Sequence, residues 1–188
     1  EKRGYLLLSA HREENIDTRQ NFENLFASIN ALAEIYDMPI LYSCHPRSKK
    51  RLDESGFQLD SRVHVHEPLG FHDYNSLQAN AFCVVSDSGT LPEEASFWTS
   101  IGRPFPAVCI RTSTERPEAL DKGGFILAGI SGNGVLQAVQ TAVSLWENGD
   151  YGSTVPCYEE DVSQRVIAII QSYVGVVNKM VWRKVDDT

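Results

Sequence analysis

Short apolar runs alternate with amphipathic segments along this 188-residue chain, and this alternation is the feature that most constrains its fold. Short runs such as residues 5–9 and 82–86 are typical of strands buried on both faces. Residues 21–36 instead place apolar side chains three and four positions apart, which predicts a helix. Repeated strand–helix units form right-handed crossovers. The sequence therefore predicts an α/β fold, with a parallel sheet covered by helices on both faces.

The pattern predicts each element and a division of the chain. The expected strands are 5–9, 39–43, 63–66, 82–86, 107–110 and 124–127, and the expected helices are 21–36, 47–52, 75–81, 92–98, 117–120, 135–146 and 161–177. We expect residues 1–150 to form one domain, residues 151–160 a polar linker, and residues 161–188 a helix and tail. The last helix carries many apolar side chains and therefore needs a partner surface.

Charge and cysteine content narrow the function class. Seventeen basic and 25 acidic residues give a formal net charge of −8, without a Lys/Arg-rich run, which argues against binding to nucleic acid or to an anionic membrane. No apolar stretch reaches the ~18 residues of a membrane span. The four cysteines form no C-x-x-C pair, so we expect reduced thiols in a cytoplasmic protein rather than disulfides or a zinc site. Because the chain opens on Glu1 and runs directly into a strand, we expect it to be part of a longer protein.

Polar segments follow the predicted strands, which is where ligands bind in an open parallel sheet. Ser88-Gly89-Thr90 lies between a buried strand and a helix start, so the backbone can approach a ligand and the helix amides can attract a phosphate. Glu94, one turn into that helix, could accept hydrogen bonds from sugar hydroxyls. A simple Ser/Thr helix cap is the alternative for this segment.

Other candidates each have a functional and a structural interpretation. His11 could bind a phosphate or handle a proton, or it could cap a helix or pack. Arg12, Arg111 and Arg116 could clamp a phosphate or form ordinary surface ion pairs. Tyr74 could stack on a base or belong to the core.

One pair of histidines raises the question of a metal. His64 and His66 face the same side of a predicted strand, but the nearby sequence offers no third ligand. A structural role for both histidines is therefore favoured, and we expect no metal site.

Several polar motifs occur in a fixed order along the chain. They are His11-Arg12-Glu13-Glu14-Asn15, His45-Pro46, Asp87-Ser88-Gly89, Glu93-Glu94-Ala95 and Thr114-Glu115-Arg116-Pro117-Glu118. From Tyr5 to Val177, this order and spacing resemble the non-hydrolysing UDP-N-acetylglucosamine 2-epimerases, which are isomerases. The resemblance implies a protein of two Rossmann-like domains in the GT-B arrangement, of which this chain is the second. The terminal helix would then cross over to pack on the N-terminal domain, which is missing from this chain.

The resemblance also implies roles for the candidate residues. His11, a catalytic residue, and Arg12 would lie beside the diphosphate, which Ser88, Gly89 and Thr90 would hold. Glu94 would bind the ribose, Leu69 and Tyr74 would lie beside the uracil, and Arg111 would line the cleft. The catalytic carboxylates of the family belong to the missing N-terminal domain.

Some segments resemble one branch of the family more closely. Residues 11–15, 45–47, 71–75 and 86–90 are similar to the enzymes that form UDP-N-acetyl-L-fucosamine from a UDP-2-acetamido-2,6-dideoxy-L-talose precursor, for capsule polysaccharide and O-antigen synthesis. Thr90 stands where the commoner pattern has a second glycine. The segment 96–104 is several residues longer than the corresponding segment usually is in the family. Leu69 stands at a position that is polar in many relatives.

The implied reaction inverts C2 of a UDP-sugar by eliminating UDP and adding it back, without a cofactor or metal. The isolated chain would bind UDP but would not turn over, and the longer protein would be a homodimer. Two other functions stay open: the nucleotide-sugar-binding half of a GT-B glycosyltransferase, and a non-enzymatic UDP-sugar-binding module.

Overall fold

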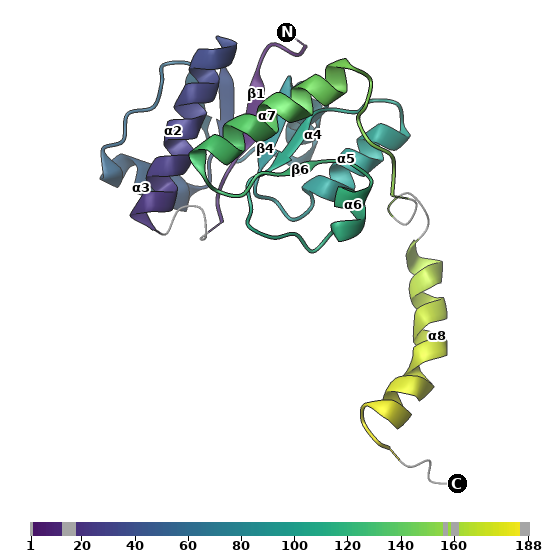
Figure 1. Ribbon diagram of the computed structural model, residues 1–188. Helices are drawn as coiled ribbons and strands as arrows, with labels where there is room; N and C mark the ends of the chain where they lie inside the picture. Colours follow the sequence, from purple (N-terminus) through teal and green to yellow (C-terminus); the bar gives the residue numbers. More distant parts are fainter. Residues whose placement is uncertain (1, 13–17, 156–157, 159–161, 185–188) are drawn as a thin grey trace. The chain divides into compact units, whose positions relative to one another are not determined.

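The computed structural model describes residues 2–12, 18–155, 158 and 162–184. In this part of the chain, strands and helices alternate as the sequence predicts (Figure 1). The strands are β1 (Leu6–Ser9), β2 (Ile40–Ser43), β3 (Val63–His66), β4 (Cys83–Ser86), β5 (Ala107–Cys109) and β6 (Ile126–Leu127). The helices are α2 (Arg19–Tyr36), α3 (Pro46–Ser55), α4 (Phe71–Asn80), α5 (Leu91–Ser100), α6 (Pro117–Asp121), α7 (Gly132–Glu147) and α8 (Val162–Met180).

The strands form a single parallel sheet in the order β3-β2-β1-β4-β5-β6. Leu6 of β1 pairs with Ile40 on one side and with Cys83 on the other. The order therefore reverses between β1 and β4, and in such sheets the crevice beyond the carboxyl ends of these two strands is where ligands bind. This confirms the predicted α/β, Rossmann-like fold.

Alternation along the strands divides the buried side chains between two faces of the sheet. Leu6 and Leu8 belong to the main core, which α2 and α7 cover with residues such as Phe26 and Val139. Leu7 is fully buried but lies outside that cluster, so it belongs to the opposite face of the sheet. Figure 1 shows α2 and α7 crossing one side of the strands. Helices on both faces leave the strand ends as the exposed polar edge.

Several helices begin earlier than the periodicity predicts. The periodicity follows apolar side chains only, whereas these helices are started by a polar residue or a glycine. Gly70 starts α4 from an extended conformation, so the helix begins at Phe71 rather than Asn75. Ser131 caps α7 by accepting a hydrogen bond from the Gly134 amide, which lets the helix include two glycines of poor helix propensity. Strand β6 is shorter than expected, since a turn through Gly123 at φ 71° precedes it.

The chain divides into two compact units, Glu1–Val155 and Pro156–Thr188. Part of the expected linker belongs to the first unit: the Ser153 amide donates to the Lys122 carbonyl, and the buried Val155 amide donates to Ser96 Oγ. Residues 156–157 and 159–161 of that linker, and the first residue of the last predicted helix, lie outside the described residues. The assignment of domains and linker stays a prediction.

The second unit consists largely of α8, in which no residue is buried. Its apolar side chains include Val166, Ile170, Tyr173 and Val174, each about half exposed or more. None of the described helices combines the length and apolar content needed to cross a membrane.

Candidate functional site

The predicted site residues come mainly from loops at the carboxyl ends of β1, β4 and β5. His11 and Arg12 follow β1, residues 87–90 connect β4 to α5, and Arg111 follows β5. These strands are neighbours across the point where the strand order reverses. The fold therefore brings together side chains that are up to a hundred positions apart in the sequence.

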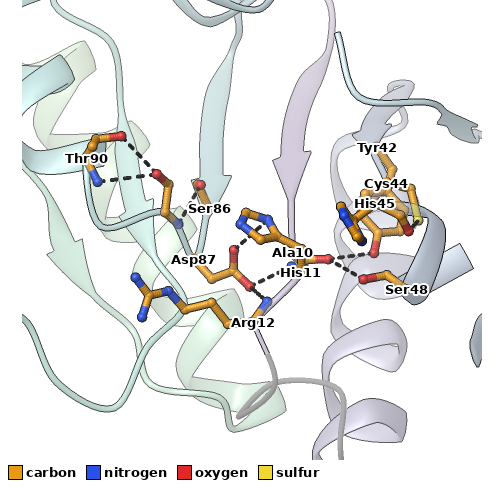
Figure 2. Close-up of polar contacts among 11 residues, drawn as sticks. Ala10, His11, Arg12, Tyr42, Cys44, His45, Ser48, Ser86, Asp87 and Thr90 are labelled. Atoms are coloured by element: carbon orange, nitrogen blue, oxygen red, sulfur yellow. Dashed lines mark hydrogen bonds and ion pairs between the residues drawn. The ribbon is translucent and has the colours of Figure 1, made fainter.

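Asp87 organises the loop after β1 (Figure 2). Its side chain is fully buried, and its Oδ2 accepts hydrogen bonds from the amides of His11 and Arg12, both at 2.7 Å. Its Oδ1 lies 3.2 Å from Nδ1 of His11, whose side chain is 44% exposed. A carboxylate at Nδ1 orients an imidazole ring and favours a proton on that nitrogen, so Nε2 stays available for a ligand.

Two guanidinium groups approach Gly89. A methyl group added at Gly89 would lie 3.2 Å from Nη2 of Arg12 and 3.8 Å from Nη1 of Arg111. The loop backbone and both cations therefore face the same small space. The Thr90 side chain accepts no capping hydrogen bond from an amide of α5, so the structure does not show the simple helix cap. The first amides of a helix lack partners within it and attract anions.

Arg111 is almost fully buried and is held by Glu115. The two nitrogens Nη1 and Nη2 donate to the two Glu115 oxygens at 2.7 Å each. This bidentate pairing lowers the pKa of Glu115 to about 2, although its side chain is 59% exposed. Arg116, the third candidate arginine, donates to Glu93 and therefore forms the ion pair of the alternative interpretation.

A chain of hydrogen bonds connects the Ser88–Thr90 loop to Glu94. The hydroxyls of Ser88 and Thr90 lie 2.9 Å apart, and Thr90 Oγ1 donates to Glu94 Oε1 at 2.6 Å. The second oxygen, Oε2, accepts from Nε2 of Gln78, a fully buried residue of α4. Both oxygens of Glu94 are therefore oriented from opposite sides.

Tyr74 of α4 is partly buried near the same strand ends. Burial, with the charge of Glu94 as a second cause, raises the pKa of Tyr74 to about 12, while the hydroxyls of Ser86 and Ser9 act in the opposite direction. Tyr74 therefore stays protonated at neutral pH. Leu69 is half-buried in the loop before α4, and its predicted role stays a prediction.

The sequence alone assigned no role to Asp87, Gln78 or Glu115, although Asp87 and Glu115 belong to the motifs that carry the family resemblance. Asp87 directly follows a predicted strand, and that position was the available signal. Gln78 lies inside a helix and gives no such signal. Glu13, Glu14 and Asn15 of the first motif lie outside the described residues.

The described residues contain no group of three or more His, Cys, Asp or Glu side chains arranged to hold a metal. His66 Nδ1 lies 2.8 Å from the Glu67 carbonyl. Cys44, Cys83 and Cys109 are free thiols and buried, while Cys157 lies outside the described residues.

Residues 1–171 match the sequence profile of the family described as UDP-N-acetylglucosamine 2-epimerase. The chain belongs to the UDP-N-acetylglucosamine 2-epimerase family. The curated UDP-N-acetylglucosamine 2-epimerase of Methanocaldococcus jannaschii is 34% identical over 151 residues, which cover 77% of this chain and 40% of that protein. The family is thus shown by sequence, while the chain spans less than half the length of such relatives.

Solved epimerase structures agree with this membership. The structure of UDP-N-acetylglucosamine 2-epimerase from Rickettsia bellii superposes with a TM-score of 0.77 at 37% identity, over 98% of this chain and 48% of that one. A Methanocaldococcus jannaschii UDP-GlcNAc 2-epimerase in complex with UDP-GlcNAc and UDP gives a TM-score of 0.74 at 32% identity, over 90% of this chain and 45% of that one. The family resemblance is confirmed, whereas the L-fucosamine branch stays a prediction.

Proposed function

We propose that this chain is the C-terminal, UDP-binding half of a UDP-sugar 2-epimerase. The supporting observation is Gly89, which lies two residues before α5 and is approached by the guanidinium groups of Arg12 and Arg111. A glycine bordered by two cations and a helix N-terminus suits a diphosphate, because amides and guanidinium groups both donate to phosphate oxygens.

Each predicted site residue has a place in this proposal. Ser88, Gly89 and Thr90 contact the diphosphate, together with Arg12 and Arg111. In the proposed complex with UDP, Glu94 accepts hydrogen bonds from the ribose hydroxyls, and Gln78 and Thr90 set the orientation of the Glu94 carboxylate. The uracil lies near Leu69 and Tyr74.

The proposed reaction removes the proton from C2 and breaks the C1–oxygen bond to UDP, which leaves a glycal. UDP then adds back at C1 while a proton returns to the opposite face of C2, so atoms and charges balance. This half of the enzyme stabilises the negative charge that develops on the departing diphosphate. His11, oriented by Asp87 at Nδ1, donates a hydrogen bond from Nε2 to the leaving oxygen in its imidazolium form, in which both ring nitrogens carry a proton. The base that removes the C2 proton comes from the other half.

The longer protein that we propose has an N-terminal domain on which the residues of α8 pack, and it acts as a homodimer in the cytoplasm. Thr90 supports a deoxysugar substrate related to UDP-N-acetyl-L-fucosamine, and hence a role in capsule polysaccharide or O-antigen synthesis.

The first experiment measures UDP binding to this chain by calorimetry. Gly89→Asp places a carboxylate near Arg12 and Arg111, so UDP affinity should fall about thirtyfold or more, as expected for lost charge-assisted hydrogen bonds. Gly175→Asp is the matched control, since a Cβ at Gly175 meets nothing within 4 Å. No UDP binding by the unaltered chain, or equal binding by both variants, would contradict the proposal.

The second experiment assays the complete enzyme with UDP-2-acetamido sugars in D₂O and no acceptor. Epimerisation with deuterium incorporated at C2 supports the elimination mechanism. Turnover that requires a sugar acceptor would instead indicate a glycosyltransferase, and binding without turnover would indicate a binding module. This chain alone should show no turnover.

A further inference from the structure

The peptide group between Ala10 and His11 is held by side chains that lie on either side of the end of β1 (Figure 2). On one side, its N–H donates to Asp87 Oδ2 at 2.7 Å, directly after β4. On the other side, its carbonyl accepts a hydrogen bond from the Tyr42 hydroxyl at 2.9 Å and another from Ser48 Oγ at 3.3 Å. Tyr42 belongs to β2 and Ser48 to α3. Both polar atoms of one peptide group are therefore fixed, and the group cannot rotate without breaking buried hydrogen bonds.

The two hydroxyls are buried, so their hydrogen bonds are shielded from water. Tyr42 and Ser48 are each 0% exposed. Burial raises the pKa of Tyr42 above its ordinary value, and the phenol therefore remains a donor at all relevant pH values. The Tyr42 ring packs against Phe26 in the core, with centroids 5.8 Å apart. Neither residue is therefore part of the exposed surface that a ligand reaches.

Filling the core would not require these hydroxyls. A phenylalanine would occupy the position of the Tyr42 ring without a polar atom to satisfy. Two hydroxyls from different elements instead converge on the same carbonyl, and the N–H of the same peptide group binds the carboxylate that contacts the His11 ring. The convergence lies one peptide group before the candidate catalytic side chain.

We propose that Tyr42 and Ser48 are positioning residues that act through the Ala10 carbonyl to orient His11. This inference rests on the proposed function, since it assigns these residues to the same site. Without the two hydroxyls, the peptide group gains freedom to rotate, and the imidazole loses its fixed approach to Asp87. Catalysis depends on such placement to within a fraction of an ångström.

The test compares Tyr42→Phe, Ser48→Ala and the double variant in the complete enzyme. We expect kcat to fall about fivefold in each single variant and about twentyfold in the double variant, as for the loss of one and two neutral buried hydrogen bonds. UDP affinity, measured by calorimetry, should change by less than about twofold, because the Gly89 loop and Arg111 are untouched.

The matched control is Tyr5→Phe. The Tyr5 hydroxyl also donates to a main-chain carbonyl, that of Leu77 at 2.7 Å. Tyr5 however precedes β1, at the amino end of the strands and away from the candidate site. Tyr5→Phe and Tyr42→Phe should lower the melting temperature by similar amounts, while only Tyr42→Phe should lower kcat. An equal loss of kcat in both variants would overturn the proposal.

A second readout asks whether Tyr42 acts through His11. In a His11→Gln background, Tyr42→Phe should cause no further loss of kcat, whereas a purely structural role would lower kcat again by the same factor. A persisting fivefold loss would overturn the proposal.

A third readout distinguishes this inference from the proposed function. ¹⁵N NMR of the His11 imidazole in this chain should show altered Nδ1 and Nε2 shifts in the Tyr42→Phe/Ser48→Ala variant and not in Tyr5→Phe. If the complete enzyme does not epimerise UDP-sugars, this measurement still tests the positioning role. Unchanged His11 shifts in the double variant would overturn it.

Discussion

Asp87 and Glu115 are two carboxylates that hold basic residues of the candidate site in different ways. Asp87 is fully buried and accepts hydrogen bonds from two main-chain amides. Glu115 is 59% exposed and pairs with the side chain of Arg111. Water can hydrate the exposed Glu115 carboxylate when its pair with the buried Arg111 breaks, whereas a buried carboxylate without its donors is costly.

The difference indicates a site with two sides. We call His11 and Arg12, held by Asp87, the fixed side, and Arg111, paired with Glu115, the exchangeable side. His11 and Arg12 hold their geometry before a ligand arrives, since their backbone is part of the folded sheet edge. In the proposed complex, a phosphate replaces Glu115 as the partner of Arg111, and the exposed Glu115 carboxylate returns to water. Four predictions test this comparison, from the largest expected effect to the smallest.

Asp87→Ala should remove the fixed side. It leaves the His11 and Arg12 amides without their buried acceptor, so the free energy of unfolding should fall by about 3–4 kcal/mol. Urea denaturation of this chain measures the change. Glu115→Ala is the comparison, with a smaller expected loss, because the Glu115 carboxylate is exposed whereas that of Asp87 is fully buried. Similar losses in both variants would show that the two sides do not differ.

Arg111→Met should remove the cation of the exchangeable side while keeping most of the side-chain volume. UDP affinity should fall about tenfold to thirtyfold, the value of one bidentate charge-assisted interaction. Calorimetry measures this loss. Arg103→Met is a suitable control, because Arg103 is exposed and stacks on Trp98 away from the site. Unchanged affinity in Arg111→Met would place the diphosphate elsewhere.

Thr90→Val should sharpen the comparison at the ribose end. It removes the hydroxyl that donates to Glu94 but leaves the Gln78 hydrogen bond, so UDP affinity should fall about threefold. Affinity for inorganic diphosphate should fall less, because Thr90 keeps its main-chain amide for the phosphates, whereas Glu94, the proposed ribose ligand, loses a hydrogen bond that orients it. Thr99→Val is a control, since the Thr99 hydroxyl bonds the Ala95 carbonyl within α5. Equal losses for UDP and diphosphate would contradict this role for Glu94.

The smallest expected effect is the pH dependence of the Arg111–Glu115 pair. Because pairing lowers the pKa of Glu115 from its ordinary 4.5 to about 2, its contribution to stability is complete above pH 4.5 and is lost as the pH falls through 2. The difference in unfolding free energy between the unaltered chain and Glu115→Gln should therefore shrink from pH 6 to pH 2.5. A difference that grows on acidification would contradict the pairing.

The sequence predicts the fold well because the physical signal is local. Apolar runs such as Leu6-Leu7-Leu8 identify buried strands, and strand–helix alternation restricts the topology. Helix starts were predicted less well, because Gly70 and Ser131 determine them through backbone conformation and a single hydrogen bond. Residues 82–86 contain the observed β4, so errors there are confined to the ends.

For the site, the sequence predicts the Ser88–Thr90 loop and the arginines but not the groups that orient them. Tyr42 occurs in an apolar run, which predicts burial and gives no information about its hydroxyl. The same holds for Gln78, whose bond to Glu94 spans 16 positions. Long-range pairing depends on the strand order, and one sequence does not encode that order in any local pattern.

The amide of His11 lies beyond the last residue of β1, beside a side chain that solvent reaches. Its acceptor is nevertheless a carboxylate from which water is excluded. Deuterium should therefore enter this amide as slowly as it enters the sheet interior, although the neighbouring imidazole meets solvent freely. Within the single residue His11, the main-chain amide should therefore exchange slowly while the N–H of the imidazole exchanges fast.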